Sequence, residues 1–154
     1  MYLRGVSSMF RVRYVMPGDR DFWFSLDRHL STEGFDEKVT TRRGYVLLKD
    51  EEPVGILRYG LFWDEIPFCN LLYVREDARG QGGGKILMEH WEQDMLSQGY
   101  SLVMTSTQAD EEAQHFYRAI GYRDCGGLVL NNRPYAQPME LLMVKNLHAE
   151  RYNI

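Results

Sequence analysis

Four glycines crowd into the stretch RGQGGGK at residues 79 to 85, which leads directly into a helical pattern. Glycine is less stable than alanine inside a helix by roughly 1 kcal/mol, so the cluster needs an explanation. The first N–H groups of a helix lack intrahelical partners and carry positive partial charge. A glycine-rich turn can direct them at an anion, usually phosphate, because no side chain blocks the approach. Arg79 and Lys85 add fixed positive charge. The alternative is a flexible surface loop that caps the helix.

The spacing of the glycines decides which of the known phosphate-binding motifs this stretch can match. A P-loop would require a glycine where Arg79 stands and a hydroxyl residue where Ile86 stands. A dinucleotide-binding motif that starts at Gly80 would place its third glycine on a lysine. The spacing that does fit is R-x-x-G-x-G, formed by Arg79, Gly82 and Gly84.

A second stretch, DEEAQHFYRAIGY at residues 110 to 122, predicts a helix that carries a hydroxyl on its apolar face. Asp110 is suited to cap this helix, and the two glutamates that follow favour its positive end. The predicted apolar face consists of Ala113, Phe116, Tyr117 and Ile120. Tyr117 is therefore either a core tyrosine or a catalytic hydroxyl.

The elements that must position these motifs follow from the hydrophobic periodicity. The predicted strands cover residues 10–15, 45–49, 53–63, 67–74, 100–107, 122–130 and 139–147, and the predicted helices cover residues 17–30, 33–43, 83–98 and 110–120. Two helices have an apolar stripe, Phe22, Leu26 and Leu30 on the first and Leu87, Trp91 and Met95 on the third. The order predicts an α/β (α+β) fold with a mixed, mostly antiparallel sheet of about seven strands.

Size and composition favour one domain over residues 1–154, with residues 1–9 as an extra N-terminal extension. The net charge of −4 disfavours a nucleic-acid partner. Cys69 and Cys125 form no CxxC pair, which predicts a reducing, cytoplasmic setting without a zinc site or other metal. No apolar run approaches the roughly 20 residues that span a membrane, and the first residues lack a signal-peptide core.

Both motifs resemble those of the GNAT family, the GCN5-related N-acetyltransferases. LLYVREDARGQGGGKILM is similar to the family's strand, pyrophosphate loop and helix, and DEEAQHFYRAIGY is similar to its N-x-x-A-x-x-F-Y-x-x-x-G-F helix. The motifs lie about 30 residues apart in the family's order, and the resemblance covers roughly residues 10 to 147. It implies a GNAT fold, a twisted sheet with helices on both sides. It also implies acetyl-CoA as co-substrate, bound where two neighbouring parallel strands splay apart.

The resemblance carries over to particular residues. It implies that the pyrophosphate loop consists of Arg79, Gly80, Gln81, Gly82, Gly83, Gly84 and Lys85, with the N–H groups of Gln81 to Gly84 holding the phosphates. It implies that the main chain of Leu72, Tyr73 and Val74 pairs with the pantetheine arm. Asp110 stands where an asparagine often binds that arm, but an ionised aspartate only accepts hydrogen bonds, so capping is the alternative. Tyr117 matches the tyrosine that protonates the leaving thiolate or donates a hydrogen bond to it.

The general base is less well defined. Many family members carry a glutamate on the strand before the glycine loop, where this chain has Asn70, and an amide cannot act as a base. Glu65 is the predicted replacement. Asp64, His29, Glu140 and a chain of water molecules are the alternatives.

The family resemblance implies that the acceptor is a primary amine of a small molecule or peptide, bound by the segments HLSTEGFDEK and NNRPYAQP. The acidic residues that could attract such an amine, or could form an ordinary solvated face, are Glu33, Asp36, Glu37, Asp64 and Glu65. The aromatic residues that could line its cleft, or could pack within the sheet, are Phe62, Trp63 and Phe68. The rival to an N-acetyltransferase is a catalytically degenerate acetyl-CoA sensor, favoured by Asn70 and Asp110 and opposed by Tyr117. A homodimer is a family-level expectation.

Overall fold

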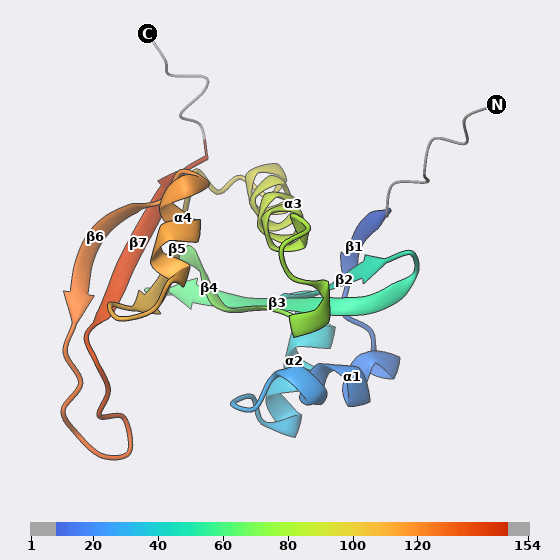
Figure 1. Cartoon of the computed structure of the whole chain (residues 1–154), viewed down its shortest axis with the longest axis horizontal. Helices are drawn as coiled ribbons and strands as arrows, with labels where there is room; N and C mark the ends of the chain where they lie inside the picture. Colours follow the sequence, from blue (N-terminus) through green and yellow to red (C-terminus); the bar gives the residue numbers. More distant parts are fainter. Residues whose placement is uncertain (1–8, 148–154) are drawn as a thin grey trace, which may run out of the picture. The chain divides into compact units, whose positions relative to one another are not determined.

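The structure, a computed structural model, describes residues 9–147, so the predicted extension over residues 1–9 lies outside them apart from Met9. The strands are β1 (Phe10–Tyr14), β2 (Gly44–Lys49), β3 (Glu52–Phe62), β4 (Ile66–Val74), β5 (Leu102–Gln108), β6 (Arg123–Leu128) and β7 (Glu140–Asn146) (Figure 1). The helices are α1 (Arg20–Leu26), α2 (Thr32–Thr41), α3 (Gly83–Ser97) and α4 (Ala113–Ala119), with short 3-10 turns η1 (Pro17–Asp19) and η2 (Glu76–Ala78). The predicted order of strands and helices is confirmed.

Within residues 9–147, seven strands form a sheet in the order β1-β2-β3-β4-β5-β7-β6. β4 and β5 pair in parallel, whereas β1 with β2, β2 with β3, β5 with β7 and β6 with β7 pair antiparallel. The predicted mixed, mostly antiparallel sheet flanked by helices is therefore confirmed. The described residues divide into two compact units, residues 9–58 with 71–91 and residues 59–70 with 92–147. The single domain stays a prediction.

In the first unit, β2 is buried along nearly its whole length because helices cover both of its faces (Figure 1). One face joins α1 and α2 in a core cluster that consists of Val15, Trp23, Phe35, Val46, Leu48 and Ile56. Side chains alternate along a strand, so Tyr45 and Leu47 point to the other face. There the Tyr45 ring packs edge-on against His90 of α3, with 5.6 Å between ring centroids.

The helix α1 is shorter than the predicted helix over residues 17–30. It ends at Leu26 because the carboxylate of Asp27 is buried and used in a turn. Asp27 accepts hydrogen bonds from the N–H groups of His29 and Leu30, from Trp23 Nε1 at 3.0 Å and from Arg58 Nε at 2.8 Å. Leu30 therefore packs on the core from beyond the turn rather than from the helix.

Two tight turns that join strands contain no glycine. Asp50 and Glu51 connect β2 to β3 with φ of 49° and 69°, and Trp63 and Asp64 lie between β3 and β4 with φ of 56° and 57°. Positive φ at both central residues is the type I′ turn that matches the twist of two antiparallel strands. The second turn is closed by the N–H of Glu65, which donates to the carbonyl of Phe62 at 3.0 Å.

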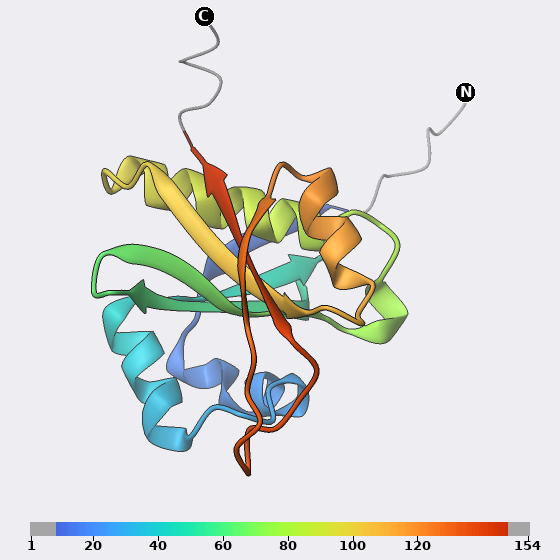
Figure 2. The same ribbon diagram turned by 90° about the vertical axis from the view of Figure 1, so that its left-hand side faces the viewer.

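In the second unit, β7 lies between β5 and β6 (Figure 2). The helix α4 begins at Ala113, so the prediction that Asp110 caps it is wrong: Glu112 holds the N-cap position and makes no side-chain capping bond. The preceding turn is instead held by Gln114, whose Nε2 donates to the carbonyls of Ala109 and Glu111, both at 2.8 Å. Because the Gln114 amide occupies these carbonyls, α4 begins three residues later than predicted.

Across residues 9–147, the structure contains no helix with the length and apolarity to cross a bilayer.

Candidate functional site

The glycine turn belongs to the first unit, where it connects η2 to α3. Gly80 and Gly82 have φ of +77° and +86°, a conformation that side-chain-bearing residues rarely adopt. A Cβ atom added at either glycine would meet no other atom within 4 Å, so the outer surface of the turn is open. Gln81, between them, is also exposed. The backbone of this turn is therefore accessible to a ligand.

Arg79 fixes the turn to the end of β4. Its Nε donates to the carbonyl oxygen of Val74 at 2.8 Å, and its guanidinium carbon lies 5.0 Å from the centre of the Tyr73 ring. Within the same stretch, the N–H of Arg75 donates to the carbonyl of Val54 at 2.7 Å, which anchors the chain just after β4. Arg79 thus holds the shape of the turn in addition to carrying charge.

Gly83 has a packing role that the spacing of the motif did not reveal. It is buried, and a Cβ atom there would lie 2.9 Å from Leu47 Cδ2 and 3.3 Å from the Phe10 ring. Only glycine lets α3 start this close to the sheet. The sequence does carry a signal for this role, because three consecutive glycines are more than a turn requires.

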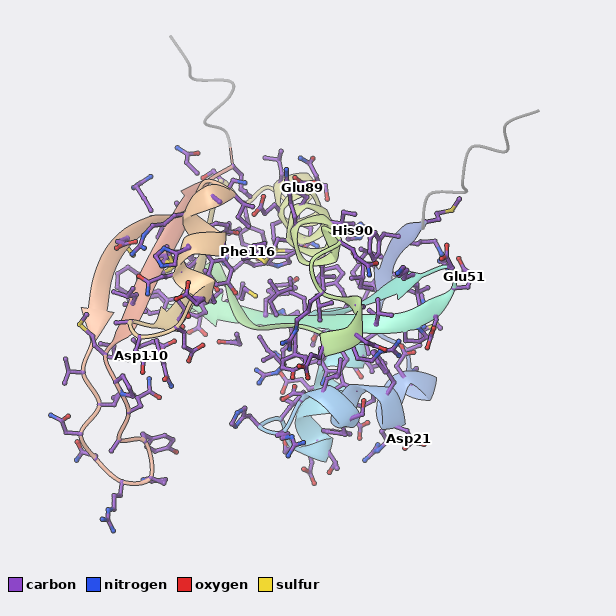
Figure 3. The ribbon with its side chains drawn as sticks, in the orientation of Figure 1. Asp21, Glu51, Glu89, His90, Asp110 and Phe116 are labelled. Carbon is purple, nitrogen blue, oxygen red and sulfur yellow. The ribbon has the colours of Figure 1, made fainter. Side chains whose placement is uncertain are left out.

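The start of α3 has the arrangement expected of an anion site. The first helical hydrogen bond runs from the N–H of Ile86 to the carbonyl of Gly82. The N–H groups of Gly82 to Lys85 consequently have no partner within the helix, and they lie at its positive end. Lys85 is exposed and forms a long ion pair of 3.8 Å with Glu89, whose position on α3 Figure 3 shows.

Tyr117 belongs to the second unit and is almost fully buried on α4. Its ring packs against the rings of Phe116 and Tyr122, at centroid distances of 5.3 and 5.7 Å. Burial is the main cause that raises the pKa of the Tyr117 hydroxyl, Cys69 raises it further, and a hydrogen bond with Thr105 acts in the opposite direction. Cys69 and Thr105 are register partners in the parallel pair β4 and β5. Asp110 lies on the connection before α4, and Phe116 lies on the helix (Figure 3).

A pocket of about 470 Å³ lies wholly within the second unit. Its lining consists of Gly60, Leu61, Phe62, Phe68, Asn70, Ser106, Leu128, Glu140 and Leu142. Three strands contribute residues two positions apart, which share one face of a sheet: Gly60 and Phe62, Phe68 and Asn70, and Glu140 and Leu142. A Cβ atom on Gly60 would lie 3.2 Å from Asn70 Nδ2, so this glycine leaves room for the amide.

The predicted bases lie in different environments. Glu65 is exposed at the turn between β3 and β4 and does not line the pocket, and Asp64 is exposed in the same turn. Glu140, at the start of β7, does line it. His29 belongs to the first unit, beside Asp27. Nothing in this placement tests Glu65, which stays a prediction. Of the aromatic residues predicted to line a cleft, Phe62 and Phe68 line the pocket, whereas Trp63 is 75% exposed.

The remaining contributors to the pocket were not identified from the sequence. Gly60, Leu61, Ser106, Leu128 and Leu142 lie in strands, and no local pattern distinguishes them. Among the residues that the structure describes, no group of three His, Cys, Asp or Glu side chains is arranged to hold a metal ion.

Comparison with known proteins identifies the family. The model of the acetyltransferase (GNAT) family matches residues 10–122, and the chain belongs to this family. No curated protein matches the sequence.

Solved structures share the fold. Naa50 of Arabidopsis thaliana, in complex with the bisubstrate analogue CoA-Ac-MVNAL, has a TM-score of 0.76 at 16% identity, and the match covers 92% of this chain and 99% of that one. N-acetylglutamate synthase of Neisseria gonorrhoeae, complexed with coenzyme A and N-acetyl-glutamate, has a TM-score of 0.74 at 16% identity, covering 91% of this chain and 35% of that one. The ribosomal-protein-S18-alanine N-acetyltransferase of Escherichia coli has a TM-score of 0.70 at 14% identity, covering 90% and 94%. Similarity at these identities establishes the fold.

Proposed function

We propose that this protein transfers an acetyl group from acetyl-CoA to a primary amine of a small molecule or peptide. The observation that carries the proposal is the open glycine turn at the start of α3, with positive φ at Gly80 and Gly82, in a chain that belongs to the GNAT family. Two structural neighbours support an amine acceptor, because one holds a coenzyme A–peptide analogue and the other holds coenzyme A with N-acetyl-glutamate.

The first unit supplies the contacts to the pyrophosphate, and those to the pantetheine arm except that of Asp110, in this proposal. The N–H groups from Gln81 to Gly84 hold the pyrophosphate, since the turn is open at Gly80 and Gly82 and these groups lie at the positive end of α3. Arg79 and Lys85 add positive charge around them. The main chain of Leu72, Tyr73 and Val74 pairs with the pantetheine arm. Contact between Asp110 and that arm is a further prediction, and the loss of its capping role leaves its carboxylate available for it.

The acetyl transfer requires two protons to leave the acceptor nitrogen. An ammonium with a pKa of about 10.4 has no lone pair, so it first gives one proton to a carboxylate. The nitrogen then attacks the thioester carbonyl carbon, the C–N bond forms as the C–S bond breaks, and the second proton is lost. One of the two protons ends on the coenzyme A sulfur, and the other goes to solvent. We assign the first transfer to Glu140, which lines the pocket, and keep Glu65 as the second candidate.

Tyr117 acts on the sulfur. A raised pKa keeps its hydroxyl protonated but makes it a weaker acid than a free tyrosine, and a thiolate with a pKa of about 8.5 cannot readily remove its proton. The environment of Tyr117 therefore supports a hydrogen bond to the developing thiolate rather than complete proton transfer. Such a bond stabilises the transition state as charge builds on sulfur.

Thiol release from acetyl-CoA, measured with a panel of amines and followed by mass spectrometry of the acceptor, tests the proposed function. The expected result is thiol release that depends on the amine, together with an acceptor that gains one acetyl group. Acetyl-CoA binding without thiol release for any amine would support the rival function, a sensor. An absence of acetyl-CoA binding would contradict both.

The proposal also includes the cellular location, the partners and the oligomeric state of the protein. We expect a cytoplasmic protein without a metal, a nucleic-acid partner or a membrane association, and a homodimer. Cell fractionation and light scattering of the purified chain check the location and the oligomeric state.

A further inference from the structure

The pocket of the second unit has a lining that restricts what it can bind. Its apolar residues are Leu61, Phe62, Phe68, Leu128 and Leu142. The rings of Phe62 and Phe68 lie 6.1 Å apart, centre to centre, and are inclined by 31° to one another. Transfer of an apolar group into such a lining is favourable by roughly 25 cal/mol for each Å² removed from water. The lining therefore favours a ligand with a substantial apolar part.

Within the part of the chain that the structure describes, the charged part of the lining is a single carboxylate. Glu140 Oε2 accepts a hydrogen bond of 2.8 Å from Gln137 Nε2, which fixes the orientation of the carboxylate. Within residues 9–147, Glu140 Oε1 accepts no hydrogen bond. An ammonium group placed there would form a charge-assisted hydrogen bond, which is stronger than a bond between neutral groups.

The same lining disfavours other amines. Among residues 9–147 it contains no Lys, Arg or His side chain, so a carboxylate or phosphate on the ligand would be desolvated without a counter-charge from them. One carboxylate cannot pair with the several charges of a polyamine. A volume of about 470 Å³ lies in the range of small-ligand sites and accommodates a compact molecule.

From these features we propose that the pocket binds the acceptor, and that the acceptor is a primary amine on a compact apolar group, preferably aromatic. The ammonium pairs with Glu140, and the apolar group packs against Phe62, Phe68 and Leu128. Gln137 is a positioning residue that holds the carboxylate. This inference rests on the proposed function for its reaction, but the selectivity of the pocket can be measured as binding alone.

The test is calorimetric titration with 2-phenylethylamine, 2-phenylethanol, ethylamine and spermidine, both without cofactor and with saturating coenzyme A. We expect 2-phenylethylamine to bind roughly tenfold or more tightly than the alcohol, which has the same ring but no charge. We also expect it to bind more tightly than ethylamine, which lacks the ring, and than spermidine. Equal affinity for the amine and the alcohol, or preference for spermidine, would overturn the inference.

Two pairs of variants locate the binding. Glu140→Gln can still accept the bond from Gln137 but lacks the charge, so it should abolish the preference for the amine over the alcohol. Glu112→Gln removes an equal charge from an exposed residue outside the pocket and should leave that preference intact. Leu128→Ser should weaken 2-phenylethylamine binding several-fold, whereas Val129→Ser, one position along and outside the lining, should not. Equal effects within either pair would place the ligand elsewhere.

Thiol release separates this inference from the proposed function. If acetyl-CoA is consumed with spermidine or a polar peptide but not with 2-phenylethylamine, the N-acetyltransferase stands and the selectivity is wrong. If 2-phenylethylamine binds with the stated preferences but no amine supports thiol release, the selectivity stands and the proposed function fails.

Discussion

The hydroxyl of Tyr117 is the residue-scale feature on which the proposed chemistry depends. Phenylalanine keeps the ring and its contacts with Phe116 and Tyr122, so Tyr117→Phe should fold normally and bind acetyl-CoA as the unmodified protein does. Its kcat should fall by roughly 10- to 10⁴-fold, because the hydroxyl acts when the thiolate forms. Since burial raises the pKa of Tyr117, its ionisation should cause no loss of rate between about pH 7 and pH 10.

The neighbouring tyrosine provides the matched control for this measurement. Tyr122→Phe also removes one buried hydroxyl, but that hydroxyl donates to Glu92 at 2.7 Å. Its loss should lower the free energy of unfolding and leave kcat nearly unchanged. Unchanged turnover in Tyr117→Phe would make Tyr117 a packing residue and remove the thiolate donor from the mechanism.

The conformation of Gly82 supports a second residue-scale prediction. Alanine at this φ of +86° is strained by roughly 1 kcal/mol, and it also adds a methyl group to the surface that we assign to the pyrophosphate. Gly82→Ala should therefore weaken acetyl-CoA binding, measured by titration, and lower the stability slightly. A valine there should weaken binding further.

Gly99, just beyond the end of α3, is the control for backbone strain. It has a φ of +95° and open surroundings, as Gly82 has, but it lies outside the glycine turn. Gly99→Ala should lose a similar amount of stability and keep its affinity for acetyl-CoA. An equal loss of affinity in both variants would mean that strain, rather than contact with the cofactor, explains the effect at Gly82.

At the scale of elements, a buried network in the second unit holds together the C-terminal part of α3, the connection between α4 and β6, and β7. Glu92 accepts hydrogen bonds from Tyr122 Oη and from Lys145 Nζ, each at 2.7 Å. Glu92 is nearly fully buried, and Lys145 is only partly exposed. Removal of one partner from such a pair leaves a charge without compensation, which costs roughly 3–5 kcal/mol.

Glu92→Leu should accordingly lower the free energy of unfolding by about 3–5 kcal/mol, measured by urea titration. The double variant Glu92→Leu with Lys145→Met should recover much of that loss, because it removes both charges and keeps the apolar volume. A double variant as unstable as Glu92→Leu would show that the ion pair is not the source of the stability.

For the whole molecule, Tyr117 and Tyr122, two of the four buried tyrosines among residues 9–147, predict how stability depends on pH. Burial raises the pKa of Tyr117 and of Tyr122 in the folded protein, and the bond to Glu92 further favours the protonated Tyr122. The unfolded chain ionises its tyrosines near pH 10, so the stability that these two residues contribute is complete below that pH and is lost above it. The loss should be about 1.4 kcal/mol per tyrosine for each pH unit above 10.

Urea unfolding at about pH 8 and about pH 11 measures this slope, and Tyr122→Phe should reduce it by the contribution of one tyrosine, about 1.4 kcal/mol per pH unit above 10. The same curves test the predicted single domain. Circular dichroism and tryptophan fluorescence should give coincident transitions if the two compact units unfold together. A slope that Tyr122→Phe leaves unchanged would mean that other groups control the alkaline transition.

The sequence by itself determined which elements form and where the glycine turn lies. Hydrophobic periodicity and glycine spacing are local properties, and they were sufficient for the order of strands and helices, the buried stripe of Leu87, Trp91 and Met95, and the R-x-x-G-x-G turn. The predictions from local patterns were wrong at two helix ends, the end of α1 and the start of α4. Asp27 ends α1 through bonds that include Arg58, and Gln114 sets the start of α4 in place of Asp110, because side chains there compete with the helix for backbone groups.

Only the tertiary structure decided the packing role of Gly83 and the composition of the pocket. A side chain at position 83 would collide with Leu47 and Phe10, which lie far away in the sequence, so only glycine fits there. The pocket collects residues from strands that are distant in the chain, and alternation within each strand shows which residues share a face but not which strands are neighbours. Pairing between β5 and β7, and between β7 and β6, brings Ser106, Glu140 and Leu128 together. Strand order is a property of the folded sheet. For that reason Glu140 could be named from the sequence as a candidate base, but its position in the pocket could not be predicted.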